Sequence, residues 1–329
     1  MLAEKSSAIK IHRAYVAVGG IGLSGITGTA QTVVSRADSH VTELDIEKLH
    51  ALCEESLPAN LIQNQKILHS IPISYKLDGK TIPTKNPLDM KGTKLEVKML
   101  FITCLEPHLN DLLEVVDRAG VEVIDCLASP IATSFATLTK LQKTAGCILA
   151  NIGAETISII VFENYIPVSL EVFPIGSTDI TNDIALGLKI PLEEAESIKL
   201  GGISATSYPK KKLDEIISAR LSDMFELIEN HLKKIGRNGL LPAGIFITGG
   251  GGGINNIEEF AKSSLKLPSR VAVINLGDQK TNLKDSTWAV AYGLCTLGLS
   301  KDEKTNLGLR SRVGKSGEKV LGWIKQFLP

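Results

Sequence analysis

The chain has few cysteines and few aromatic residues, and it has neither an excess of one charge nor a long apolar run. Its five cysteines form no CxxC pair and its six histidines no HxxxH pair, so we expect neither a disulfide framework nor a metal site. The 36 basic and 36 acidic residues cancel, which removes the broad positive field typical of nucleic-acid binding. No apolar stretch reaches the roughly 18–20 residues of a membrane-spanning helix, and residues 1–13 contain no signal-peptide core. We therefore expect a cytoplasmic protein.

The apolar content is that of a globular protein with aliphatic cores. Hydrophobic residues make up 43% of the 329 residues and aromatic residues only 5%, so Ile, Leu, Val and Ala must fill the interior of two or three domains. Apolar runs and period-two alternation predict strands at residues 14–20, 25–35, 67–77, 95–103, 121–124, 147–151, 156–163, 165–173 and 244–248. Spacing of 3.6 residues predicts helices at residues 41–55, 109–119, 130–141, 212–235, 256–262 and 286–299.

The helix expected at residues 41–55 has a start that can be assigned to individual side chains. Thr42 can accept a hydrogen bond from the first turn, and Asp45 stands three residues later, the spacing of a capping box. We therefore expect the helix to begin immediately after Thr42.

A run of five glycines follows the strand expected at residues 244–248 and precedes the helix expected at 256–262. Glycines in this position let backbone amides approach a phosphate or a ribose, and the helix N-terminus adds a favourable dipole. The layout therefore predicts a nucleotide-binding turn, and the alternative is a merely flexible turn. The glycines expected to contact the ligand are Gly249, Gly250, Gly251 and Gly252.

The turn from Asn151 to Thr156 is a second candidate for phosphate binding. It joins two apolar strands, and its glycine, Gly153, leaves the amides accessible while Thr156 adds a hydroxyl. The alternative is an ordinary hairpin, because any tight hairpin needs small turn residues.

A third candidate is the acidic segment that contains Glu196 and Lys199. On a helix these two residues share a face, so they could bind a ribose and the edge of an adenine. The alternative is a solvated ion pair on the helix surface.

These elements follow one another as hairpin turn, acidic helix and glycine-rich turn, which is the order found in the actin-like ATPase superfamily. Within that superfamily the chain closely resembles the FtsA family of bacterial cell division proteins over nearly its whole length. Motifs between residues 35 and 97 resemble the family's own subdomain, 1C, which ordinary actins, Hsp70 proteins and sugar kinases lack. The matching segments are Ser35–Asp38, Val41–Ile46, Leu68–Pro72, Leu77–Gly79, Asn86–Val97, Pro174–Gly176, Ile180–Ala185, Ile217–Arg220 and Ile247–Gly251.

The resemblance implies a fold and a set of ligands. The fold would be α/β, an actin-like (ribonuclease H-like) architecture of two lobes with an inserted β-rich 1C subdomain of SHS2 type. ATP with Mg²⁺ would bind between the lobes, with Gly153 and Thr156 near the phosphates. Gly176, in the segment after the hairpin, would also bind the nucleotide. Partners would be the C-terminal tail of the tubulin-like division protein FtsZ, other copies through subdomain 1C, anionic membrane lipids and downstream division proteins.

The resemblance also divides the chain into subdomains. Residues 1–26, 104–150 and 286–299 would form subdomain 1A, and residues 27–103 subdomain 1C. Residues 151–188 and 244–285 would form subdomain 2A, with a reduced subdomain 2B at 189–243. Residues 300–313 would be a linker and 314–329 an amphipathic membrane-targeting helix.

The last helix can be predicted without the resemblance. Its apolar residues fall on one stripe, while Lys319 and Lys325 lie off it, and residues 300–329 carry an excess of basic over acidic side chains. Such a helix suits an anionic membrane surface, and the alternative is a helix docked on the protein's own core. The stripe consists of Val320, Leu321, Trp323, Ile324, Phe327 and Leu328.

Three departures from the family pattern bear on nucleotide chemistry and on partners. The strand–turn–strand with which relatives begin is absent from the sequence, so we expect an incomplete first lobe and a truncated N-terminus. Asn151 stands where the family has an Asp that organises the metal and the attacking water, and Glu155 adds a negative charge near phosphate. The stretch between Gly202 and Leu213 is short, which reduces the subdomain that receives the FtsZ tail.

We therefore expect a division protein that tethers FtsZ filaments to the cytoplasmic membrane at the division site and assembles with ATP, with weak or absent hydrolysis and no confident catalytic residue. A cytoplasmic scaffold of a type IV pilus or secretion machine, similar to PilM, is the alternative, because a similar hairpin occurs there. A true ATPase enzyme is a third possibility, which the neutral amide of Asn151 disfavours.

Overall fold

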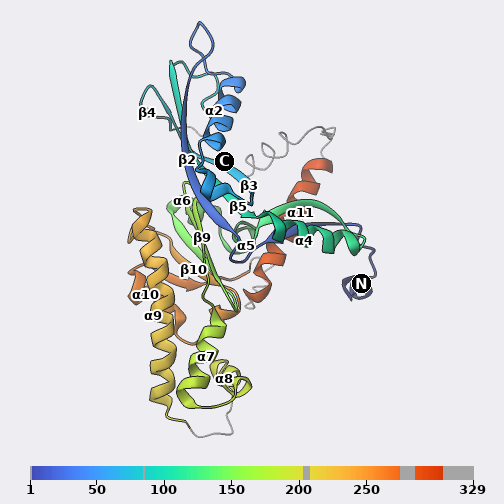
Figure 1. The fold of residues 1–329 in the computed structure, drawn as a ribbon, viewed down its shortest axis with the longest axis vertical. Coiled ribbons are helices and arrows are strands. Elements are labelled where there is room, and N and C mark those ends of the chain that lie inside the picture. Colours follow the sequence, from blue (N-terminus) through green and yellow to red (C-terminus); the bar gives the residue numbers. More distant parts are fainter. Residues whose placement is uncertain (1, 84–85, 203–207, 275–285, 307–329) are drawn as a thin grey trace.

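The computed structural model describes residues 2–83, 86–202, 208–274 and 286–306. It is elongated, with a central sheet, a smaller domain at one end and two short helices at the other (Figure 1). Three separate sheets of five, four and two strands organise the described chain. Strand and helix alternate along the sequence in an α/β arrangement, as the sequence predicts.

The central sheet has the order β11-β10-β7-β8-β9. β10 runs parallel to its neighbours β7 and β11, whereas β7, β8 and β9 form an antiparallel meander. Most side chains of the inner strands are buried on both faces, which explains their continuous apolar sequences. Four strands of this sheet are confirmed as predicted: β7 Cys147–Ile152, β8 Ile157–Glu163, β9 Ile166–Phe173 and β10 Gly244–Thr248. The short strand β11, Ser269–Val271, was not predicted.

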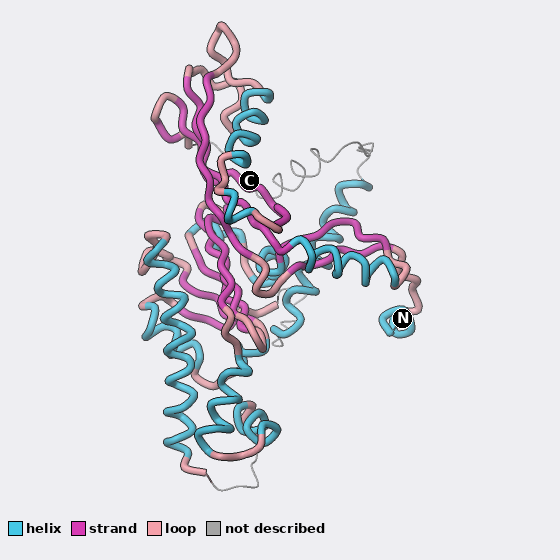
Figure 2. Tube along the Cα trace, in the orientation of Figure 1, coloured by secondary structure: helices cyan, strands magenta, loops and turns pink. Residues whose placement is uncertain are grey.

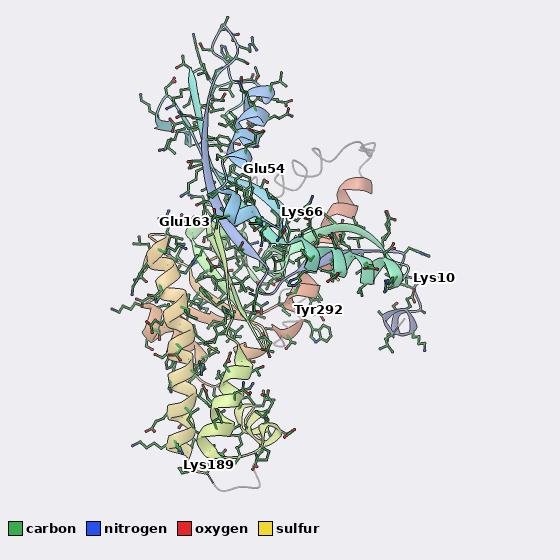
Figure 3. All side chains as sticks on the ribbon, in the orientation of Figure 1. Lys10, Glu54, Lys66, Glu163, Lys189 and Tyr292 are labelled. Carbon is green, nitrogen blue, oxygen red and sulfur yellow. The ribbon has the colours of Figure 1, made fainter. Side chains whose placement is uncertain are left out.

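Four helices pack on one face of this sheet or extend from it: α7 (Ser177–Leu188), α8 (Leu192–Lys199), α9 (Lys210–Lys234) and α10 (Ile257–Leu265). The apolar stripe of α9 is buried along the sheet, which confirms its predicted periodicity. α9 begins directly after Pro209, whose carbonyl accepts hydrogen bonds from the amides of Lys212 and Leu213. Lys189 marks the far end of α7, at the tip of the molecule (Figure 3).

On the opposite face lie α5 (Ser129–Thr137) and α6 (Lys140–Ala145), and α11 (Ala289–Asn306) packs against α5. The single helix expected at residues 130–141 is wrong, because Thr139 starts a new helix with a capping box to Gln142. α11 begins after a 3₁₀ turn, Ser286–Trp288. It continues through residues 300–306, where we expected a linker to begin, since lysine and glutamate are good helix formers.

The domain at the upper end in Figure 1 consists of residues 24–105. Its antiparallel sheet has the order β2-β5-β3-β4 and carries α2 on one face, where Leu49 and Cys53 are fully buried (Figure 2). Thr42 caps α2 and Asp45 completes the capping box, as predicted. The bounds are β2 Ser24–Val33, α2 Glu43–Glu55, α3 Ala59–Ile62, β3 Gln65–Leu77, β4 Lys80–Thr81 and β5 Lys94–Leu105.

A third unit projects sideways as an arm that carries the N-terminus (Figure 1). Here β1 (Arg13–Val18) pairs in parallel with β6 (Glu122–Ala128), next to α4 (Glu106–Arg118) and α1 (Leu2–Ser7). α4 starts one turn earlier than predicted because Pro107 occupies its first turn, where proline is tolerated. Within the ranges that the structure describes, no helix is both long enough and apolar enough to cross a membrane.

Candidate nucleotide-binding site

The register of the central sheet brings two of the predicted elements together. β10 pairs with β7 so that Thr248 lies opposite Asn151 at the ends of the two parallel strands. The glycine run that follows Thr248 therefore starts beside the hairpin turn that follows Asn151. Ligands of open α/β sheets typically bind at this carboxyl edge.

The glycines of the run have two different functions in the packing. A β carbon on Gly249 would lie 2.5 Å from the Ile152 carbonyl oxygen and closer still to Oδ1 of Asn151, and its φ of +86° also favours glycine. Gly251 is likewise in contact with the side chain of Ile152. Gly250, by contrast, is exposed and has no neighbour within 4 Å of the place of a β carbon. We infer that Gly249 and Gly251 allow the two turns to approach, while Gly250 leaves room for a ligand.

The start of the glycine run is anchored to the 3₁₀ turn that precedes α11. The Ser286 hydroxyl donates a hydrogen bond of 3.0 Å to the Gly249 carbonyl, and the Thr248 hydroxyl donates one to the Ser286 carbonyl. Residues 250–253 form a 3₁₀ turn within which the Gly252 amide bonds to the Gly249 carbonyl. Both Thr248 and Ser286 are buried, so these hydrogen bonds are shielded from water.

The hairpin turn is closed by a hydrogen bond of 2.9 Å from the Gly153 amide to the Thr156 carbonyl. Its own carbonyls accept the first amides of α7, from Ser177 to Gly153 and from Thr178 to Ala154, each at 2.9 Å. The N-terminus of α7 is therefore bonded to the hairpin. Gly176 makes this contact possible, because a β carbon there would overlap the Ala154 carbonyl.

Glu196 and Lys199 lie on α8 and join it to the first turns of α7. The Lys199 ammonium is 2.7 Å from a Glu196 carboxylate oxygen and donates to the Thr181 hydroxyl at 2.8 Å and the Ser177 carbonyl at 3.1 Å. The Lys199 side chain is only 5% exposed, so the pair is not the solvated surface pair that we considered. All three N–H groups of the Lys199 ammonium have partners within the chain. Lys199 therefore has a structural role, in which it holds α8 against the first turns of α7.

These contacts change the pKa of the Glu196 carboxyl. Its partial burial acts to raise its pKa, but hydrogen bonds from Lys199 and Thr181 outweigh burial and lower the pKa below its ordinary value. Glu196 is therefore an anion that accepts hydrogen bonds, and it does not act as a proton donor near neutral pH.

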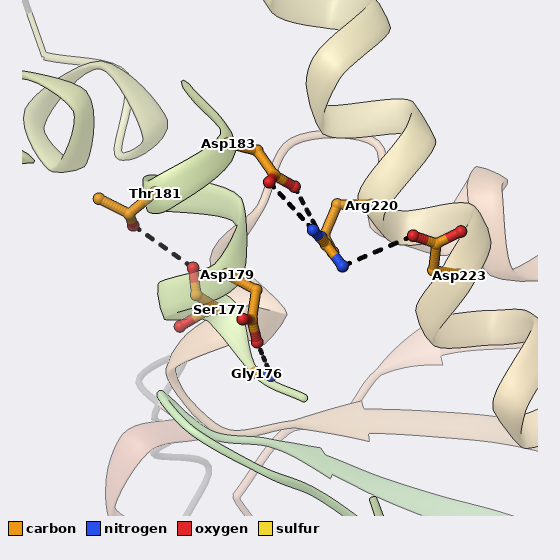
Figure 4. A network of polar contacts seen from close by, with 7 residues as sticks. All are labelled: Gly176, Ser177, Asp179, Thr181, Asp183, Arg220 and Asp223. Atoms are coloured by element: carbon orange, nitrogen blue, oxygen red, sulfur yellow. Dashed lines mark hydrogen bonds and ion pairs between the residues drawn. The ribbon is translucent and has the colours of Figure 1, made fainter. Parts of the chain in front are cut away.

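One polar contact of this region has no counterpart among the predicted site residues. Arg220 on α9 makes a two-pronged ion pair with Asp183 on α7, with N···O distances of 2.6 and 2.9 Å, and a longer one with Asp223 (Figure 4). Asp179 caps the start of α7 by accepting from the Gly176 amide. The sequence contains Arg220 in a family-like segment, but its partner lies 37 residues away, and no local spacing reveals the pair.

The chemistry available at this edge is that of backbone amides and hydroxyls. The described part of the chain contains no group of three or more His, Cys, Asp or Glu side chains that could hold a metal ion. Asn151 supplies a neutral amide, which is a poorer metal ligand than a carboxylate.

Some of the predicted residues and segments lie wholly or partly outside the described parts of the chain. The amphipathic helix predicted at 314–329, with Val320, Leu321, Trp323, Ile324, Phe327 and Leu328, lies outside the described residues. The short segment between Gly202 and Leu213 is described only in part, since residues 203–207 also lie outside the described residues.

Comparison with known protein sequences supports the resemblance to the FtsA family that the sequence motifs indicate. The family model "Cell division protein FtsA" matches residues 148–293, and "SHS2 domain inserted in FTSA" matches residues 24–103. The Cell division protein FtsA of Pseudomonas aeruginosa is 28% identical over 322 residues, covering 91% of this chain and 76% of the relative. That of Bacillus subtilis is 29% identical over 315 residues, covering 89% and 69%. That of Escherichia coli K12 is 24% identical over 354 residues, covering 99% and 82%.

Solved structures show the fold. The PilM-PilN type IV pilus biogenesis complex contains a chain with a TM-score of 0.61 and 16% identity, covering 90% of this chain and 82% of that one. MreB 5 of Spiroplasma citri bound to AMPPNP gives a TM-score of 0.50 and 16% identity, covering 62% and 68%. At such identities the likeness concerns the backbone alone, and it confirms the predicted actin-like fold.

Proposed function

The chain belongs to the FtsA family of cell division proteins, and from that membership we propose that it tethers filaments of the tubulin-like protein FtsZ to the inner face of the cell membrane. The observation that carries this proposal is the domain at residues 24–105, a four-stranded sheet with one long helix, inserted into an actin-like fold. Its residues 24–103 match the domain that is named for its insertion in this family.

The proposed nucleotide is ATP with Mg²⁺. Gly153 and Thr156 would lie near the phosphates, and the exposed Gly250 would lie near the nucleoside, with Gly249, Gly251 and Gly252 shaping the turn. Gly176, Glu196 and Lys199 would act through the start of α7, which they hold against the hairpin. The open space beside Gly250 supports this assignment.

Hydrolysis is proposed to be weak or absent, so that bound nucleotide controls assembly rather than fuelling turnover. The neutral amide of Asn151 is in contact with Gly249 and supplies no carboxylate for a metal or an attacking water. The exposed Glu155 adds negative charge to the hairpin turn and would oppose a phosphate there.

The proposed partner surface for the FtsZ tail is the far end of α7 and α8. Two leucines there are largely exposed, at 78% and 54%: Leu186 and Leu192. Self-association is proposed through the inserted domain, whose exposed apolar residues Val33 and Leu44 lie on β2 and α2.

The membrane contact is proposed to be the predicted helix at 314–329, which would make the protein peripheral and cytoplasmic. A single short helix binds weakly, and assembly of many copies on one filament would strengthen binding through multivalency.

A flotation assay with anionic liposomes tests the tether. Deletion of residues 314–329, or Trp323→Glu on the apolar stripe, should release the protein from the liposomes. Gln326→Glu is the matched control, since it adds the same charge off the stripe and should preserve most binding. Equal flotation of all variants would contradict the tether, and a peptide of the FtsZ tail that fails to bind the full chain would contradict the partner.

A second candidate is a scaffold of a type IV pilus or secretion machine, in the manner of PilM. It is favoured by one observation, the TM-score of 0.61 to a chain of the PilM-PilN complex. Binding of a short pilus-protein peptide without binding of the FtsZ tail would establish this function instead.

A further inference from the structure

The inserted domain has two exposed faces that differ in charge. Its sheet carries α2 on one face (Figure 2), and the side chains of β5 alternate between the two faces. Val97 and Met99 belong to the core under α2, whereas Glu96 and Lys98 lie on the outer face of the sheet. The domain lies in the interior of the sequence, between β1 and α4, so neither face depends on how the chain begins.

The outer face of the sheet is basic and hollowed. Glu96 is paired with Lys94 at 3.0 Å, whereas Lys76 and Lys98 are exposed and form no ion pair with any described residue. Two ammonium groups therefore remain available to carboxylates of another surface. The hollow has a volume of about 430 Å³ and is lined by polar residues of all three long strands: Thr29, Gln31, Ser74, Lys76, Glu96 and Lys98.

The exposed side of α2 is acidic. Leu49 and Cys53 mark the buried stripe of this helix, and Glu47 and Glu54 are exposed on the opposite side, about two turns apart. Neither carboxylate forms an ion pair within the described part of the chain. The domain thus carries unpaired acids on its helix and unpaired lysines on the far face of its sheet.

Each of these faces also carries one exposed aliphatic side chain. Val33 lies opposite Lys94 on the outer face of the sheet and is 72% exposed. Leu44, in the first turn of α2, is 74% exposed. Both residues stand next to the connection between β2 and α2, so they lie at the same end of the domain.

The charged side chains follow at similar distances from these two aliphatic residues, on both faces in the direction away from the connection. On the sheet, the rows that contain Lys76 and Lys98 lie two and four residues along β2, which is about 7 and about 13 Å. On the helix, Glu47 and Glu54 lie three and ten residues along α2, which is about 5 and about 15 Å. The two faces are therefore complementary in charge and comparable in spacing.

We propose that the exposed side of α2 in one copy docks on the outer sheet face of a second copy. This contact rests on the self-association proposed above for the inserted domain, and it specifies the surfaces that meet. Since the two surfaces are different, the contact is heterologous and can repeat from copy to copy. The pairs that meet are Leu44 with Val33, Glu47 with Lys76, and Glu54 with Lys98.

The test is the association state of the full chain, measured by sedimentation velocity at low ionic strength over a wide range of protein concentrations. A sheet variant, Lys76→Glu with Lys98→Glu, and a helix variant, Glu47→Lys with Glu54→Lys, each place like charges on both faces. Association should weaken by about tenfold or more in each variant. All four side chains are exposed, so the fold should persist, as circular dichroism would show.

Charge complementation separates this contact from a general loss of association. An equal mixture of the sheet variant and the helix variant should associate again, because each acidic face then meets a basic one. A chain with all four substitutions should also associate. Lys211→Glu with Lys262→Glu, on α9 and α10, is the matched control: it changes the net charge as the sheet variant does and should associate as the unaltered chain does.

A second measurement makes the contact local. A bifunctional thiol cross-linker should join Val33→Cys chains to Leu44→Cys chains in a mixture, and either variant alone should cross-link no more than the unaltered chain. An unaltered chain that stays monomeric with and without ATP would overturn the proposed self-association and this contact with it. Association that persists in the sheet and helix variants, or that their mixture does not restore, would overturn this contact alone.

Discussion

Gly249 lies against the side chain of Asn151, so closely that the pair leaves no room for a β carbon at position 249. The contact joins the turn after β10 to the turn after β7, the two turns that a nucleotide would have to bridge. The position that the family fills with a catalytic carboxylate thus holds a neutral amide packed against a glycine. The proposal of nucleotide binding and assembly with little hydrolysis rests on this arrangement.

We expect Gly249→Ala to separate the two turns. The new methyl group would meet Asn151 and the Ile152 carbonyl, and the φ of +86° would strain any residue with a β carbon. The free energy of unfolding should fall by about 2 kcal/mol or more, and ATP binding should be lost with it. Chemical denaturation and a fluorescent ATP analogue would measure both.

Gly250→Ala is the matched control for this prediction. Nothing lies within 4 Å of its new methyl group, so the free energy of unfolding should change by less than about 0.5 kcal/mol. A loss of ATP affinity in this variant, at unchanged stability, would locate the nucleoside beside Gly250. Equal stability of the two variants would contradict the packing function of Gly249.

We expect Lys199→Met to destabilise the junction of α7 and α8. The ammonium donates to Glu196, Thr181 and the Ser177 carbonyl, and its removal takes one donor from each of them. The loss should be about 1–3 kcal/mol in chemical denaturation. Lys211→Met removes a lysine that is 91% exposed and 3.9 Å from Glu215, and it should change stability by less than about 0.5 kcal/mol.

Much of the fold follows from local pattern. The strands of the central sheet are continuous apolar runs, and the start of α2 is encoded by Thr42 and Asp45 three residues apart. These features depend on neighbours in the sequence, so the sequence is sufficient to find them. The division of residues 130–141 into two helices was missed, although Thr139 and Gln142 carry the same capping spacing.

The candidate site was predictable as a set of elements but not as a set of contacts. The turns at Gly153 and Gly249 do lie side by side, because the strands before them pair. The burial of Lys199 could not be foreseen, since it depends on α7, a helix that the apolar pattern did not predict. Contacts between helices far apart in sequence need the three-dimensional arrangement.

We expect Arg220→Lys to loosen α9 from α7 although it keeps the charge. Arg220 holds both carboxylate oxygens of Asp183, and a lysine ammonium cannot reproduce this planar two-pronged geometry. The loss should be about 1 kcal/mol, seen in chemical denaturation and as faster hydrogen exchange at the start of α9. Arg118→Lys, in an exposed ion pair with Glu114, is the control and should have almost no effect. Similar losses in both variants would mean that the two-pronged geometry is unimportant.

The capping box of α2 should make the inserted domain sensitive to acid. Burial of Asp45 acts to raise its pKa, but hydrogen bonds from Thr42 and Ser35 outweigh burial and lower the pKa to about 2, from an ordinary value of 3.8. A carboxyl with a depressed pKa stabilises the folded state fully above its ordinary pKa. It loses this contribution, about 2 kcal/mol, as the pH falls toward the depressed value.

Asp45→Asn should reveal this dependence. The amide cannot accept all the bonds that Thr42 and Ser35 donate, so the variant should be about 1–2 kcal/mol less stable than the unaltered chain at neutral pH. The difference should shrink as the pH falls from about 4 to about 2, because the carboxyl of the unaltered chain becomes neutral as well. Glu43→Gln removes an exposed carboxylate from the same turn and should leave the acid dependence unchanged. A difference between Asp45→Asn and the unaltered chain that stays constant down to the lowest pH would show that the bonds of Asp45 do not depend on its charge.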